Sequence, residues 1–161
     1  MASVKEQTVA PQGTSQATPK AEILDLKIQL VSKGHHKHVL AQTDMSSFNV
    51  HCYAPKGGEN GMHAHMEEDH VFLVLQGEAQ FVTPDGPMPV IGKHQALFIP
   101  KGAFYSFSAE GTENLVLARF GANPPGKAHG RRLDPNGNFI PGRAQKEGAV
   151  KPHFIEGKFF E

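Results

Sequence analysis

The sequence predicts an all-β protein with one antiparallel β-barrel at its centre. Residues 46–120 contain many short segments with the alternating or continuous apolar pattern of β-strands. Glycine and proline turns such as Pro84-Asp85-Gly86-Pro87 separate these segments, a spacing typical of barrels and jelly rolls. The 161 residues suit a single domain that is long enough to bury a core.

Composition narrows the possible partners and location. Lys plus Arg number 16 and Asp plus Glu number 16, so the formal net charge is zero. This balance argues against a nucleic-acid or membrane-surface partner, because both require a basic face. The single cysteine, Cys52, cannot form an internal disulfide, and no apolar run reaches the ~20 residues of a membrane span. The first residues also lack a secretory signal pattern, so we expect a cytoplasmic protein.

Outside the barrel we expect a flexible tail at residues 1–20, an N-terminal arm at 21–45 and a C-terminal extension at 121–161. Alternation in the arm predicts a strand over residues 23–31, and the histidine-rich stretch 34–38 is expected to be an exposed polar turn. The extension contains three turn signals and is expected to be irregular and to wrap the barrel. The barrel strands are expected at residues 48–53, 71–75, 79–83, 95–99, 103–108 and 114–120.

The stretch with the clearest chemistry is His63-Ala64-His65, followed by His70 at the start of an apolar run that ends at Gly77. Residues two apart on an extended segment point to the same face, so His63 and His65 present two imidazoles together. If the strand beginning at His70 lies alongside, a third imidazole completes the face and leaves open positions on a bound metal ion.

The same residues resemble the first cupin motif. The sequence has Gly57, His63, His65, position 70 and Gly77 at the spacing of that motif, with His70 where cupins usually have Glu. The segment Pro100-Lys101-Gly102-Ala103-Phe104-Tyr105 resembles the second motif, with Tyr105 where a histidine is usual. The resemblance covers residues 46–120 and implies a small cupin barrel with a metal ion in its mouth.

We therefore expect the metal ligands to be His63, His65, His70 and Tyr105. Imidazole donors suit one divalent transition metal per chain, with iron favoured and Mn, Ni, Zn or Cu also accommodated. Tyr105 can be a phenolate ligand, a neutral proton donor or a packing aromatic, and the proton donor is preferred. The acidic run Glu67-Glu68-Asp69 can orient the histidines or supply a ligand, but as a turn it is expected to be solvated.

Five further side chains are candidates for substrate binding. His51 and Tyr53 lie on the polar face of their strand, which faces either the cavity or solvent. Arg119 lies on an otherwise apolar face and can bind a carboxylate, although pairing with a surface acid is the commoner role of such an arginine. Phe72 and Phe107 share faces with His70 and Tyr105 respectively and complete the expected set.

These features, with the cupin resemblance, lead to an enzyme that acts on a small oxygen-bearing organic substrate, with a mononuclear iron dioxygenase as the leading interpretation. A non-redox isomerase, cyclase or lyase uses the same kind of centre. A non-catalytic cupin that binds a small ligand is the alternative from another class. The doubly apolar strand 71–75 and the arm strand 23–31 lack an evident cover within the chain, so a homodimer is expected.

Overall fold

The computed structural model describes residues 20–57, 61–127, 131–140 and 150–161. All regular structure in these ranges is β-strand, which confirms the predicted all-β class. Among the same residues, no helix is long and apolar enough to cross a membrane. The predicted flexible tail lies, except for Lys20, outside the described residues.

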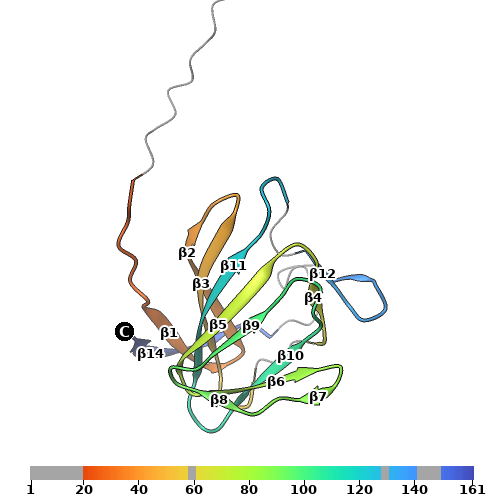
Figure 1. The fold of residues 1–161 in the computed structure, drawn as a ribbon. Helices are drawn as coiled ribbons and strands as arrows, with labels where there is room; N and C mark the ends of the chain where they lie inside the picture. Colours follow the sequence, from red (N-terminus) through yellow and green to blue (C-terminus); the bar gives the residue numbers. More distant parts are fainter. Residues whose placement is uncertain (1–19, 58–60, 128–130, 141–149) are drawn as a thin grey trace, which may run out of the picture.

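Two antiparallel sheets form the barrel (Figure 1). The five-stranded sheet has the order β2 (His35–Gln42), β3 (Ser46–Tyr53), β11 (Leu115–Ala122), β5 (Asp69–Gln76) and β9 (Ala96–Ile99). The second sheet has the order β10 (Ser106–Glu110), β6 (Glu78–Thr83) and β7 (Gly86–Pro87), and β8 (Ile91–Gly92) also pairs with β6.

The main core fills the space between these two sheets. Because side chains alternate along a strand, Phe72 and Val74 of β5 point inward, where they meet Phe81 of β6 and Phe107 of β10. Phe81 and Phe107 stack with ring centroids 5.0 Å apart. Full burial of each such side chain stabilises the fold by about 1.5–3 kcal/mol. The barrel interior is therefore a packed core at this level.

A second core lies on the outer face of the five-stranded sheet. The strand pair β1 (Ile28–Lys33) and β14 (His153–Phe160) covers that face, with Ile28 opposite Phe160 in register. The buried members of this core are Ile28, Val31, Val50, Cys52, Ala54 and Val116. The arm strand was expected at residues 23–31 without a cover in the chain. It begins at Ile28, and β14 is its partner.

The barrel strands expected from alternation are present as β3, β5, β6, β9, β10 and β11. The exposed turn expected at residues 34–38 is wrong, because β2 begins at His35 and pairs with β3. The His35 ring stacks on the Tyr53 ring with centroids 4.1 Å apart. An imidazole therefore packs at a strand position where the alternating pattern predicts an apolar side chain. Residues 121–161, expected to be irregular, also contain β12 (Arg132–Leu133) and β13 (Phe139–Ile140) besides β14.

Candidate metal centre

Short backbone pairings bring the histidine-rich stretch to one end of the barrel. His63 and Tyr105 form an isolated bridge, in which each backbone N–H donates to the other residue's carbonyl at 2.9 Å. The two-residue strand β4 (Ala64–His65) pairs with β12, which places Arg132 opposite His65. The chain then turns through Glu68 and enters β5, so His65 and His70 approach each other from different strands.

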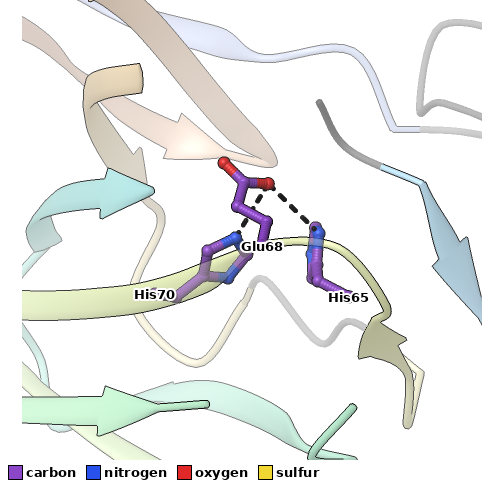
Figure 2. A group of neighbouring side chains, drawn as sticks. All are labelled: His65, Glu68 and His70. Atoms are coloured by element: carbon purple, nitrogen blue, oxygen red, sulfur yellow. Dashed lines mark ion pairs between the residues drawn. The ribbon is translucent and has the colours of Figure 1, made fainter. Parts of the chain in front are cut away.

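Glu68 lies between these two histidines (Figure 2). Its Oε2 is 3.0 Å from Nε2 of His70 and 3.5 Å from Nδ1 of His65. All three side chains are buried, and one ligand atom from each lies within 4.8 Å of the other two. Among the described residues this is the group of His, Cys, Asp and Glu side chains that is compact enough to hold a metal ion.

The expectation that the acidic run is solvated is wrong for Glu68, which is 2% exposed. The reason lies in a distant strand: a Cβ atom at Gly121 would be 2.0 Å from Oε1 of Glu68. The missing side chain at Gly121 leaves the room that the carboxylate occupies. Ser47 donates to the same Oε1 at 3.2 Å. Asp69 instead accepts the Lys101 backbone N–H at 2.7 Å near the surface.

Arg119 supplies the charge that balances Glu68. Its Nη2 donates to Glu68 Oε2 at 3.0 Å and also contacts Nε2 of His70. Burial alone would raise the pKa of Glu68, but the close approach of His65 and His70 and the charge of Arg119 outweigh burial and hold that pKa well below its usual range. The partner of Arg119 is thus a buried acid at the centre, rather than a surface acid.

The histidines of the centre are neutral at pH 7. Burial lowers the pKa of His63 and of His65 to about 4, and burial also lowers the pKa of His70. Neutral imidazoles keep a lone pair on one ring nitrogen, which is the form that binds transition metals.

The four expected ligands gather at this place, although not all in one tight group. Nδ1 of His63 is 2.8 Å from the Gly61 carbonyl, to which it donates, and the His63 ring centroid is 5.3 Å from that of His65. The Tyr105 hydroxyl is 3.3 Å from Nδ1 of His70. Burial raises the pKa of Tyr105, so its phenol stays protonated. In this structure Glu68, and not His63, completes the compact group.

The expected substrate-binding residues divide into two sets. His51 and Tyr53 lie on the inner face of β3 and are buried, so the alternative that this face meets solvent is wrong. Phe72 contacts the edge of the His70 ring, with centroids 5.7 Å apart. Phe107 lies deeper and packs on Tyr53 at 5.2 Å. These placements put His51 and Tyr53 nearest to the polar interior, and Phe107 in the packed core.

The donor set fits a transition metal. Nδ1 of His65 is buried and has no hydrogen-bond partner among the described residues, an arrangement that a metal ion would satisfy. Two imidazoles and one carboxylate are the donor set of non-haem Fe(II) oxygenases. Arg119 contacts two of the three candidate ligand atoms, so a metal ion and this guanidinium would compete for the same acceptors.

A surface cavity of about 650 Å³ lies away from this centre. The hairpins at residues 76–78 and 110–113 line it, together with Lys93 and Phe160. Because Gln76 is six residues along β5 from His70, the cavity is roughly 20 Å from the histidines at ~3.3 Å per residue. Its lining contains no histidine, so the buried group at the other end remains the candidate site.

Comparison with known proteins agrees with this architecture. Residues 49–118 match the family model described as the cupin domain. This chain contains a cupin domain. Its match begins within β3 and ends within β11, so it includes the whole histidine-rich stretch, Glu68 and Tyr105.

Solved structures show the same fold at low sequence identity. A protein with a double-stranded β-helix domain from Klebsiella pneumoniae has a TM-score of 0.57 and 18% identity, covering 75% of this chain and 96% of its own. A cupin superfamily protein from Desulfitobacterium hafniense has a TM-score of 0.53 and 16% identity, covering 60% of this chain and 84% of its own. A conserved protein of unknown function from Streptococcus pyogenes has a TM-score of 0.54 and 20% identity, covering 69% of this chain and 93% of its own. No curated protein sequence matches the chain.

We expect Gly121→Ala to weaken metal binding, because the added methyl group would displace the Glu68 carboxylate. Crowding a packed site in this way costs about 1–3 kcal/mol of folding stability. The measurement is metal content per chain after dialysis against a defined metal concentration. Gly92→Ala is the matched control, since the nearest atom to its new Cβ is 3.9 Å away. Equal metal content in the two variants would contradict the role of Gly121.

Proposed function

We propose that this cupin is a metal-dependent enzyme that acts on a small oxygen-bearing organic substrate, and that it is a mononuclear iron dioxygenase. The observation that carries the proposal is the buried group of His65, Glu68 and His70. Two nitrogen donors and one carboxylate oxygen favour Fe(II) and leave positions for substrate and oxygen. Mn, Ni, Zn and Cu accept similar donors. We therefore propose a divalent transition metal, with iron preferred.

His65, His70 and Glu68 would hold the metal ion, which when bound supplies Lewis acidity and the capacity to activate oxygen. Arg119 keeps Glu68 ionised and oriented through its 3.0 Å hydrogen bond. The protonated Tyr105 hydroxyl next to His70 can give a hydrogen bond or a proton to a substrate oxygen. Phe72 covers the inner side of His70 and keeps water from that side of the centre.

Two other functions use parts of the same geometry. A non-redox isomerase, cyclase or lyase needs the same ligands and the same proton at Tyr105, but consumes no oxygen. A non-catalytic cupin that binds a small ligand is favoured by one specific observation. Arg119 already places a cation against Glu68 and His70, so the buried charge is balanced without a metal ion.

Tyr105→Phe tests the role of the phenol because it removes only the hydroxyl group, and oxygen uptake separates the functions. For the dioxygenase we expect iron content to be retained and oxygen uptake to fall by ~10²–10⁴, the usual contribution of an acid–base group. The measurement is oxygen consumption by iron-loaded protein with a panel of diketones, phenols and keto acids. Phe104→Leu, which changes the neighbouring side chain and leaves the Tyr105 hydroxyl in place, is the control. Turnover without oxygen consumption would point to the non-redox enzymes, and absence of any turnover to the binding protein.

We also propose a homodimer formed through the uncovered part of the five-stranded sheet. Strand register places Phe48, Phe120, Val71 and Phe98 in one row across its outer face. Phe98 is 61% exposed and Phe120 is 46% exposed, beyond the area that β1 and β14 cover. The net charge of zero means that two copies do not repel each other.

Light scattering at micromolar concentration is expected to give twice the mass of the chain, and Phe98→Glu is expected to give the monomer. A charge at the centre of an apolar interface costs several kcal/mol. Val90→Glu, at an exposed apolar position outside that row, is the control. A monomeric wild-type protein would contradict the dimer.

A cytoplasmic location is likewise proposed. Cys52 is a free thiol in the second core, and burial raises its pKa to about 11. The thiol is therefore protonated and shielded at neutral pH, and it supports a reducing compartment because no second cysteine exists to pair with it.

A further inference from the structure

The inner face of β3 carries polar groups that the metal centre does not use. Ser47, Asn49 and His51 alternate along this face, and Ser47 already donates to Glu68. Asn49 is 3% exposed on the same face. Nε2 of His51 is also buried without a partner in the described part of the chain. A buried ring nitrogen without a partner, next to a buried amide, indicates a place for a polar ligand.

Nδ1 of His51 faces two groups that are able to donate a hydrogen bond to it. Nδ1 lies 2.9 Å from Nε2 of His35 and 3.4 Å from the Tyr53 hydroxyl. When one of them donates, Nδ1 acts as the acceptor, and the single proton of the neutral ring is then on Nε2. His51 thus directs an N–H donor into the interior, and the Asn49 amide can supply a second donor.

The charge around these donors is positive. Lys37 of β2 is the register partner of His51 and stands at the rim of the same face. Arg119 of β11 is the register partner of Asn49. Arg132 approaches from the strand that pairs with His65. The charged groups that act on Lys37 are Arg119, Arg132 and Glu68, so Lys37 and the two arginines make three cations against one carboxylate.

We propose that the substrate is a small carboxylic acid in its anionic form, with its carboxylate bound by Lys37, Asn49 and His51. The carboxylate offers the acceptor oxygens that the N–H donors lack, and its charge offsets the excess of cations. Alternate residues on a strand are roughly 7 Å apart, so a carboxylate beside Asn49 lies about one such step from Ser47 and Glu68. That separation limits the acid to a short chain or a single ring. The inference rests on the proposed function for the reacting end of the substrate.

Binding can be tested without the metal, using chelator-treated protein. Pyruvate is titrated while the imidazole ¹H–¹⁵N signals of His51 are followed by NMR, with pyruvamide as the neutral counterpart and inorganic phosphate as a second anion. We expect pyruvate to shift the His51 signals and to bind at least ~10-fold more tightly than pyruvamide. Equal binding of pyruvate and pyruvamide, or tighter binding of phosphate than of pyruvate, would overturn the proposal.

Lys37→Met removes the charge at the rim and keeps most of the aliphatic stem. We expect it to weaken pyruvate binding by ~10-fold while leaving pyruvamide binding unchanged. Lys33→Met is the matched control, because Lys33 is exposed at the end of β1 and pairs with His153. Unchanged pyruvate affinity in Lys37→Met would overturn the role of Lys37.

The metal content of the same variants distinguishes failure of the proposed enzyme from failure of the proposed carboxylate site. Carboxylate binding with no metal uptake would contradict the proposed enzyme and support this inference. Metal uptake and oxygen consumption without a preference for the carboxylate would support the enzyme and overturn this inference.

Discussion

The buried carboxylate of Glu68 is the interaction on which the candidate centre depends. An ionised carboxylate removed from water costs several kcal/mol unless its oxygens are hydrogen-bonded and its charge is paired. Here Ser47 bonds one oxygen, and His70 and Arg119 share the other. These partners come from three different strands, so the compensation exists only in the folded barrel. Loss of any one partner leaves a buried charge only partly satisfied, which explains why the end of the five-stranded sheet is so closely built around Glu68.

The charge of Glu68 can be balanced in two ways, by Arg119 or by a metal ion. Without a metal ion, the guanidinium neutralises Glu68 and contacts His70. With one, the metal would take a share of the same acceptors, and Arg119 would add to the positive charge near Lys37 and Arg132. Both states leave the interior cationic relative to its single acid. An anionic substrate would therefore be favoured in either state, and most strongly when the metal is bound.

Strand alternation predicted the barrel well and the site only in part. The pattern of residues 71–75 gave Phe72 and Val74 as inward side chains, as the structure has them. For residues 48–53 it left open whether the polar face meets the cavity or solvent, because both faces of this strand are covered. Strand β2 was missed because its packing residues include His35 and not an aliphatic side chain. Glu68 was expected in solvent because its burial depends on Gly121, fifty-three positions along the chain, where the lack of a Cβ leaves room for a carboxylate. The residues around Glu68 in the sequence do not indicate that a distant glycine leaves this space.

The central claim is that Glu68 joins His65 and His70 as a metal ligand. The most direct measurement is a crystal structure of iron-loaded or manganese-loaded protein with anomalous scattering at the metal edge. The account predicts one metal peak bonded to Oε2 of Glu68 and to one nitrogen each of His65 and His70, with Arg119 moved away from His70. A metal ion held by His63, His65 and His70, with Glu68 still paired to Arg119, would contradict it.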